Sequence, residues 1–305
     1  MLIMKAHTTG RPFLRSLGAF VLTLGLCAPA AAQTAHPSFD VKVTGQGPAI
    51  VLIPGLLSAG EVWDSTVERY QGRHTLHVLT LAGFGGPAPV GAPFLPRVRD
   101  EVVAYLREQK IQKAVIVGHS LGGFLAFWIG ATAPDLVGGI VAVDGVPFLP
   151  ALGNPAASAE STKPQAEQIK GIYASLTNAQ LVAQSRMAFA TMITAPADVE
   201  RAAAWVAKSD ATTTGLAVAE LMATDLREDV AAITAPTLLI GALGSAPEAM
   251  RPAMAKSYTA QVSRIKSARV VMAEKARHFI MFDDPPFLFS TLDEFLASYR
   301  QGAKN

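Results

Sequence analysis

Cysteine is nearly absent from this sequence, since Cys27 is the only one among 305 residues. A single thiol cannot close an intramolecular disulfide, so the burial of apolar side chains must supply the stability of the fold. Charge is also scarce and balanced, with 16% charged residues and 26 Lys and Arg against 24 Asp and Glu. This balance excludes the basic surface through which proteins bind nucleic acid, and we expect no nucleic-acid partner.

The sequence contains no apolar run long enough to form a transmembrane helix. The apolar segment near the N-terminus, residues 17–26, is half the length of about 20 residues that a bilayer requires. Lys5, Arg11 and Arg15 precede this segment, and small residues follow it up to Ala32. This order is typical of a secretory signal peptide rather than of a buried N-terminal helix. We therefore predict cleavage after Ala32 and export to the periplasm or the medium.

Removal of residues 1–32 would change both the charge and the thiol content of the protein. This segment holds three basic residues, no acidic residue, and Cys27. Twenty-three Lys and Arg would then face 24 Asp and Glu, so the formal net charge would fall from +2 to −1. The remaining length suits one large globular domain, or one domain with an insertion.

Short apolar runs alternate with helical patterns along most of the remaining chain. A continuous apolar run suits a strand that is buried on both faces, so the alternation predicts an α/β fold with a mostly parallel sheet between helices. The expected strands are 40–44, 49–53, 76–81, 114–117, 140–143, 237–240 and 269–272, and the expected helices are 98–109, 121–133 and 286–299.

The pattern changes between residues 147 and 233, where no strand is evident. Alanine-rich helical stretches replace the strands, and we predict that they form a helical cap inserted over the sheet. This divides the mature chain into a first core segment, 33–146, the cap, 147–233, and a second core segment, 234–305. The expected cap helices are 166–176, 179–191 and 197–208, separated by Pro147, Pro150, Pro155, Pro164 and Pro196.

One apolar run ends in the most informative motif of the sequence. The β-branched run 115–117 leads into Gly118-His119-Ser120-Leu121-Gly122-Gly123, and a helix-forming stretch follows. A Gly-x-Ser-x-Gly motif between a strand and a helix is typical of a nucleophile elbow, a strained turn that exposes the serine Oγ. A structural turn with an unreactive serine is the alternative, and the flanking strand and helix argue against it. We predict Ser120 as the nucleophile.

A serine hydroxyl needs a base within hydrogen-bond reach, and the base needs an orienting acid. His278 is the only histidine downstream of Ser120, and it follows the expected strand 269–272. A loop after the last strand reaches the sheet edge where Ser120 is expected, so we predict His278 as the base. His119, inside the elbow, is expected to pack or hydrogen-bond behind Ser120 rather than act on substrate.

The choice of acid is between three carboxylates. Asp144 ends the strand that follows the elbow helix, at the sheet edge that carries active sites in open α/β folds. A carboxylate that ends a buried strand is costly unless it is paired, and His278 would pair it. The alternatives are that Asp144 only caps a turn, or that Asp225 or Glu248 is the acid. We predict Asp144.

The oxyanion of an acyl-transfer intermediate needs two N–H donors. One is expected from Leu121, directly after the nucleophile, and the other from the segment that follows the strand 49–53. Leu56 is the predicted second donor, with Leu57 as the alternative.

These residues resemble the α/β-hydrolase superfamily over nearly the whole mature chain. The resemblance is carried by Leu52-Ile53-Pro54-Gly55, by the elbow around Ser120, and by Arg277-His278-Phe279. It implies a mostly parallel eight-stranded sheet, with a helical cap between strands six and seven. It also implies hydrolysis through an acyl-enzyme, without a metal or an organic cofactor.

The sequence departs from the family pattern at two places. Pro54 replaces a usual histidine, which should leave the oxyanion backbone intact. No carboxylate directly follows the seventh strand, which favours Asp144, on the sixth strand, as the acid. The related haloalkane dehalogenases and epoxide hydrolases use an aspartate at the elbow, so Ser120 argues against both.

The function that we expect is an exported serine hydrolase, similar to carboxylesterases, acting on a small-molecule acyl substrate. Amide, lactone or C–C bond hydrolysis would use the same residues, and a non-catalytic binding protein is the alternative of a different class. The sequence predicts no particular oligomeric state. Five large cap residues suggest an apolar acyl or alcohol group, although ordinary helix packing explains each of them alone: Met187, Phe189, Met192, Trp205 and Met222.

The predicted signal peptide can be tested by mass spectrometry of the exported protein. Expression of the full sequence in a bacterium should give a mature chain that begins at Gln33. Replacing Ala32 with Phe should block this cleavage, because signal peptidase requires a small residue at that position. A mature chain that still begins at Met1 in the wild type would contradict the prediction.

Overall fold

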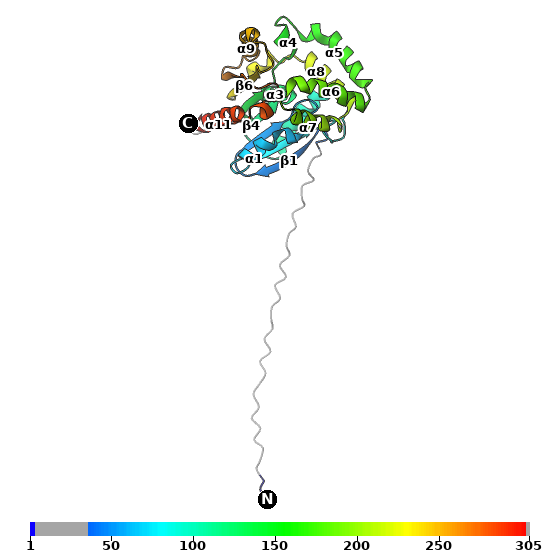
Figure 1. Ribbon diagram of the computed structural model, residues 1–305. Helices are drawn as coiled ribbons and strands as arrows, with labels where there is room; N and C mark the ends of the chain where they lie inside the picture. The colour runs from blue at the N-terminus through cyan, green and yellow to red at the C-terminus, as the bar shows by residue number, and fades with distance from the viewer. Residues whose placement is uncertain (4–35, 303–305) are drawn as a thin grey trace. The chain divides into compact units, whose positions relative to one another are not determined.

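A single sheet of seven strands lies at the centre of the fold, in the order β1-β3-β2-β4-β5-β6-β7 (Figure 1). β1 pairs antiparallel with β3 at one edge, and every other pair is parallel. The strands are β1 (Phe39–Gly45), β2 (Ala49–Ile53), β3 (Thr75–Leu81), β4 (Ala114–His119), β5 (Val137–Val143), β6 (Thr237–Ala242) and β7 (Ala268–Ala273).

This computed structural model describes residues 1–3 and 36–302. Residues 4–35, which include most of the predicted signal peptide and its cleavage site, lie outside the described residues. Residues 36–305 form one compact unit. Within the described residues, no helix has both the length and the apolar composition that a membrane span requires.

Apolar runs and the alternating segment 40–44 predicted seven strands, and each of them has its counterpart in the sheet. The eight strands that the family resemblance implied are one too many for the described chain. Only residues 36–38 precede the edge strand β1 in the segment 36–302, so no residues are present there for a further strand. Because the sheet has one strand fewer before the insertion than the family resemblance implied, the observed β5 and β6 correspond to the expected sixth and seventh strands. The insertion lies between them.

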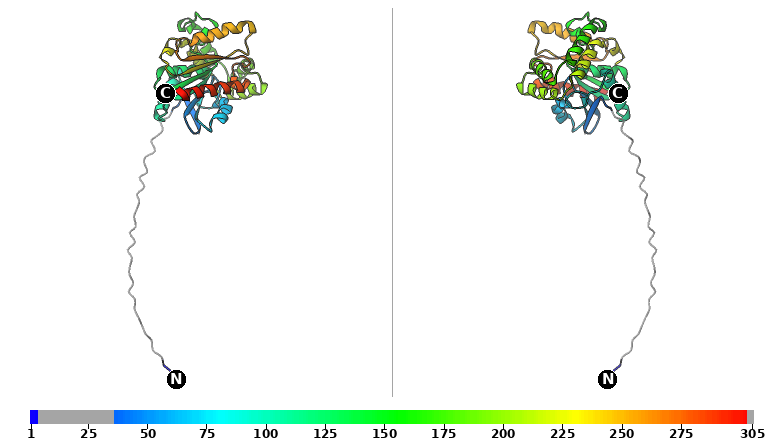
Figure 2. Two further views of the ribbon diagram at one scale, coloured as in Figure 1. Left: turned by 90° about the vertical axis from the view of Figure 1, so that its left-hand side faces the viewer. Right: turned by 90° about the vertical axis from the view of Figure 1, so that its right-hand side faces the viewer.

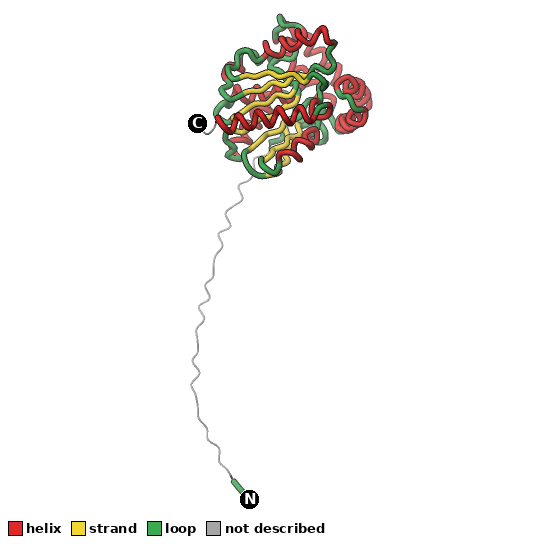
Figure 3. The backbone as a smooth tube through the Cα atoms, turned by 60° about the vertical axis from the view of Figure 1, so that its left-hand side comes forward, coloured by secondary structure: helices red, strands yellow, loops and turns green. Residues whose placement is uncertain are grey.

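Helices cover both faces of the sheet (Figures 2 and 3). A Cβ on Gly139 of β5 would lie 3.0 Å from the ring of Phe295, whereas the next residue, Ile140, contacts Gly130. Successive residues of a strand point to opposite faces, so the helices that carry Phe295 and Gly130 lie on opposite sides. Outside the insertion the helices are α1 (Asp64–Tyr70), α2 (Leu95–Glu108), α3 (Leu121–Thr132), α9 (Arg251–Gln261), α10 (Ile280–Asp283) and α11 (Pro285–Gly302), with 3₁₀ turns η1 (Gly60–Trp63) and η3 (Glu248–Met250); a further 3₁₀ turn, η2 (Asp229–Ala232), ends the insertion.

Burial explains why the central strands have continuous apolar sequences. Every residue of β4 and of β5 is buried, because helices pack on both of their faces. In the edge strand β1, by contrast, only Phe39 is buried. The β4 sequence therefore ends in the core, and the turn that follows it projects from a rigid support.

The helices between β5 and β6, which we call the insert (residues 147–233), gather on the right of the sheet in Figure 1. The insert contacts the loops that follow two strands of the parallel part of the sheet. Asp210 N donates to Gly83 O after β3, and Phe279 N after β7 donates to Met192 O. The insert therefore lies over the C-terminal edge of the sheet. Its helices are α4 (Pro150–Gly153), α5 (Ala159–Ala174), α6 (Asn178–Met192), α7 (Pro196–Val206) and α8 (Ala211–Ala223).

Two features of the insert differ from the sequence prediction. Pro164 lies inside α5, although it was expected to separate helices. Packing against α8 maintains this helix, since Thr162 Oγ1 donates to Met222 O at 2.7 Å. The helix α8 itself was not predicted, because its Thr and Gly residues have low helix propensity. The side chain of Asp210 caps its N-terminus by accepting from Thr213 N at 2.6 Å.

Candidate active site

Ser120 occupies the sharp turn between β4 and α3. Its backbone has φ 52° and ψ −115°, a left-handed conformation that a side chain rarely adopts. The turn is held by Ser120 N, which donates to Val143 O at 2.9 Å. A Cβ on Gly118 would lie 2.0 Å from Gly122 O, and a Cβ on Gly122 would lie 2.2 Å from a backbone oxygen of β2. Both positions therefore require glycine, and the strain at Ser120 is imposed by its surroundings.

His278 and Asp144 form a hydrogen-bonded pair beside this turn. The distance between His278 Nδ1 and Asp144 Oδ2 is 2.6 Å. Asp144 directly follows β5, and His278 lies in the loop between β7 and α10. Because His119 pairs with Val143 in the β4–β5 register, Ser120 and Asp144 are the next residues of adjacent strands. The three predicted residues thus converge at one edge of the sheet.

The second oxygen of Asp144 accepts two further hydrogen bonds. Ala242 N donates to Oδ1 at 2.8 Å, and the hydroxyl of Tyr258 donates to the same oxygen at 2.6 Å. The carboxylate is only 8% exposed, so these donors supply the pairing that a buried charge requires. Burial and the charge of Asp144 raise the pKa of Tyr258, so the phenol remains a proton donor. Sequence reasoning missed Tyr258, although a buried tyrosine hydroxyl in general needs a partner.

His119 lies between the elbow and the loop of His278. Its Nε2 is 3.0 Å from the backbone oxygen of His278, which makes it the donor of that bond. The centroids of the His278 and Phe279 rings each lie 4.6 Å from that of His119. Burial, and secondarily the nearby His278, lowers the pKa of His119 well below its usual value. The neutral ring therefore supports the backbone of the loop that carries His278.

The loop after β2 lies directly against Ser120. A Cβ on Gly55 would approach Ser120 Cβ to 3.1 Å and His119 Nδ1 to 2.8 Å, so this position also requires glycine. Within the described chain, the backbone N–H groups of the predicted donors Leu56 and Leu121, and of the alternative Leu57, donate to no protein acceptor. Leu56 follows Gly55 and Leu121 follows Ser120, so donors from two segments flank the serine.

The other candidate acids lie apart from His278. The carboxylate of Asp225 accepts from Arg227 Nε and Nη2 at 2.9 and 2.6 Å. Glu248 begins the 3₁₀ turn η3 and has no hydrogen bond to His278. Of the three carboxylates considered, only Asp144 contacts the imidazole.

The insert contacts the His278 loop through several side chains. The ring centroids of Phe189 and Phe279 are 5.6 Å apart, and those of Trp205 and Phe282 are 6.3 Å apart. Met187, which was expected to line a pocket, is 67% exposed and points away from the core. Met187 therefore neither packs in the core nor supports the suggestion of an apolar group, because the alanine-rich sequence of α6 does not specify which side of the helix faces the site.

Two charged residues join the C-terminal end of α6 to the His278 loop. The guanidinium of Arg277 donates to Ala190 O and Ile193 O at 3.0 and 3.1 Å. Asp283 accepts from Thr194 N and from Arg277 N, each at 2.8 Å. The residue next to His278 is therefore bound on one side to the insert and on the other to α10.

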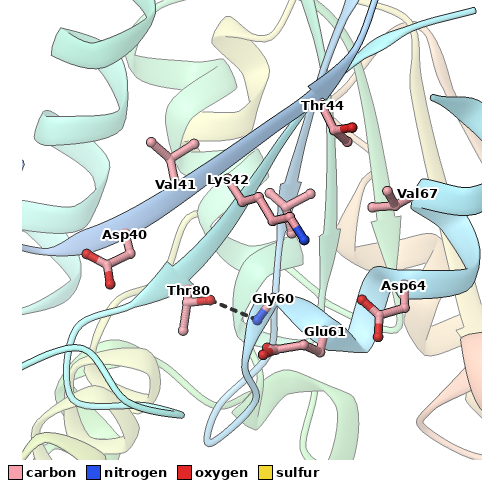
Figure 4. Close-up of a pocket in the computed structure, with 10 residues that line it drawn as sticks. Asp40, Val41, Lys42, Thr44, Gly60, Glu61, Asp64, Val67 and Thr80 are labelled. Carbon is pink, nitrogen blue, oxygen red and sulfur yellow. Dashed lines mark hydrogen bonds between the residues drawn. The ribbon is translucent and has the colours of Figure 1, made fainter. Parts of the chain in front are cut away.

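A cavity of about 210 Å³ lies at the opposite edge of the sheet (Figure 4). β3 and β2 separate β1 from β4, and the cavity is lined by residues of β1, β3, η1 and α1, including Lys42, Glu61 and Asp64. It is therefore distinct from the site around Ser120. Neither there nor anywhere else in residues 36–302 are three His, Cys, Asp or Glu side chains grouped so that they could hold a metal ion.

Comparison with known proteins gives a consistent family. A model described as "Alpha/beta hydrolase family" matches residues 50–291. A pimeloyl-[acyl-carrier protein] methyl ester esterase from Aeromonas hydrophila is 27% identical over 269 residues, covering 85% of this chain and 99% of the relative. The esterase of the same name from Aliivibrio salmonicida is 34% identical over 106 residues, covering 35% of this chain.

The extent of similarity differs among these relatives. The similarity spans 39% of the Aliivibrio salmonicida esterase, and 39 to 40% of the corresponding Vibrio esterases. Among solved structures, the enol-lactonase from Burkholderia xenovorans LB400 has a TM-score of 0.67 at 19% identity, covering 85% of this chain and 96% of the lactonase. At this identity the structural likeness concerns the fold alone.

The burial of His119 predicts a pH dependence of stability. Because its pKa is lowered in the folded state, the unfolded chain binds a proton near pH 6.5 that the folded chain does not. The contribution of the neutral His119 to the free energy of unfolding is therefore complete above pH 6.5. It is lost as the pH falls, at up to about 1.4 kcal/mol per pH unit. His119→Gln should flatten the fall in unfolding free energy below pH 6.5, measured by urea denaturation.

Burial also lowers the pKa of His77, which lies away from the elbow on β3. His77→Gln is therefore a matched control, and the two substitutions together should flatten the curve more than either alone. An unchanged slope in His119→Gln would mean that His119 carries a proton in the folded protein.

Proposed function

Because the chain belongs to the alpha/beta hydrolase family, we propose that it is a serine hydrolase that cleaves an ester or a related acyl bond. One observation carries this proposal, namely the pairing of His278 with Asp144 beside the strained turn at Ser120. A turn of purely structural importance would not need an imidazole paired with a buried carboxylate next to its serine.

In the proposed reaction, Ser120 Oγ attacks the acyl carbon and His278 Nε2 accepts its proton. The backbone N–H groups of Leu56 and Leu121 donate to the oxygen of the tetrahedral intermediate. His278 then protonates the leaving group, which departs as an alcohol, and the acyl group remains on Ser120. Water attacks this acyl-enzyme with His278 again as the base. Throughout, Asp144 holds the imidazole with its Nδ1 proton toward the carboxylate, so that Nε2 is free to accept.

We propose a carboxylic ester as the substrate, because the curated relatives bear the name of a methyl ester esterase. Phe279, which lies beside the His278 ring and packs against Phe189 and Phe282, favours an apolar group on that ester. Lactone, amide and C–C bond hydrolysis would use the same residues. An assay with p-nitrophenyl esters of increasing chain length, beside lactone and amide substrates, would rank these classes.

Covalent labelling by a fluorophosphonate probe tests whether Ser120 is activated. The folded wild-type protein should be labelled on Ser120, as located by peptide mass spectrometry. Ser120→Ala should abolish labelling, and His278→Ala should slow it by orders of magnitude, because the base is then absent. A folded wild-type protein that is not labelled would indicate a binding protein rather than an enzyme.

The identity of the acid can be tested by amide substitutions. Asp144→Asn should lower kcat on the order of 10³- to 10⁴-fold, because the amide favours the wrong tautomer of His278. Asp225→Asn and Glu248→Gln are matched controls that should retain turnover within about twofold, since neither side chain contacts His278. If either control is the crippling change and Asp144→Asn is active, the assignment of Asp144 is wrong.

A further inference from the structure

Tyr258 contacts the proposed acid from a helix outside the motifs that identify the family. It lies on α9, which packs beside β6 (Figure 1), and it is only 4% exposed. Its hydroxyl donates to Asp144 Oδ1 at 2.6 Å. A Cβ on Gly241 would lie 3.0 Å from the Tyr258 ring, so the glycine in β6 leaves the space that the ring occupies.

The donors divide unequally between the two oxygens of Asp144. Oδ1 accepts from Tyr258 and from Ala242 N, whereas Oδ2 faces only His278 Nδ1. Among the described residues, no Lys or Arg forms an ion pair with this carboxylate, and His278 is its only basic partner. A phenol and an amide therefore offset the charge of Asp144, in place of a cation.

We propose that Tyr258 is a positioning residue for the reaction, whose hydroxyl fixes the plane of the Asp144 carboxylate so that Oδ2 is presented to His278. The expected effect on catalysis rests on the proposed function, whereas the contact between Tyr258 and Asp144 does not. The amide of Ala242 alone leaves the carboxylate free to rotate about this single contact. With Tyr258 as the second donor on Oδ1, both bonds must be broken before Oδ2 turns away from the imidazole.

The same hydrogen bond withdraws negative charge from Asp144. Without it the carboxylate is a stronger base, holds the imidazolium form of His278 more tightly, and raises the pKa of His278. The other titratable group against His278 is His119, whose ring remains neutral. Loss of the Tyr258 hydroxyl should therefore move the titration of His278 toward higher pH.

Tyr258→Phe tests this role, because it removes the hydroxyl and keeps the ring. We expect kcat to fall about tenfold with KM within about twofold, since the ring that contacts Gly241 is retained. The acidic limb of the pH profile of kcat/KM should move up by roughly half a unit. Tyr70→Phe is the matched control, since Tyr70 is also buried and donates to a carboxylate, Asp293, at 3.1 Å. This control should leave both kcat and the limb unchanged.

NMR titration of the His278 ring gives a readout that does not require turnover. The pKa of His278 should be higher in Tyr258→Phe than in the wild type and in Tyr70→Phe. If the wild type proves to have no hydrolase activity, this shift still tests the contact, so failure of the proposed function and failure of this inference are distinguishable. An unchanged pKa and an unchanged kcat in a folded Tyr258→Phe protein would overturn the proposal.

A second variant covers the case in which Tyr258→Phe does not fold. Replacement of Tyr258 by 3-fluorotyrosine keeps the hydroxyl and makes it a stronger donor. This variant should shift the pKa of His278 in the opposite direction, toward lower values. A shift toward higher values, or none, would contradict the proposed role of the hydroxyl.

Discussion

The hydrogen bond between the Asp144 carboxylate and the His278 imidazole is the interaction on which the rest of the site depends. It joins β5 to the loop after β7, across 134 positions in sequence. A carboxylate that is 8% exposed at the end of a buried strand would destabilise the fold if its oxygens were unpaired. Donors from Ala242, Tyr258 and His278 satisfy it, so β6, α9 and the β7–α10 loop all converge on one side chain.

The parallel order of the sheet explains how Asp144, which follows β5 rather than β6, can reach His278. The carboxyl ends of adjacent parallel strands lie about 4.8 Å apart at the same edge, so a carboxylate from either strand can reach the same imidazole. In this protein β6 contributes a backbone amide, that of Ala242, and a glycine, Gly241, that makes room for the ring of Tyr258. At this edge of the sheet, the carboxylate thus follows β5, whereas β6 supplies a hydrogen-bond donor to it and space for the Tyr258 ring.

Features that depend on local pattern could be predicted from the sequence, and those that depend on distant packing could not. Continuous apolar runs predicted β2 to β7, because burial on both faces leaves a direct mark on composition, and the alternation of 40–44 predicted the edge strand β1. The eighth strand came from family resemblance, and the residues from 36 to 302 do not form it. Tyr258 lies 114 positions from Asp144, and no spacing rule joins a helix residue to the end of a strand that far away. The exposure of Met187 was missed for a similar reason, since an alanine-rich helix has no marked apolar side.

The bonds of Arg277 and Asp283 connect the insert to the loop that carries His278. Arg277 holds the carbonyl groups at the end of α6, and Asp283 holds the first residues that follow, so the residue beside His278 is tethered to the segment that covers the site. A movement of that segment large enough to admit a bulkier molecule must either break these bonds or carry the imidazole along. In this architecture the position of the insert and the orientation of the His278 imidazole are mechanically coupled, and selection on either would act on both.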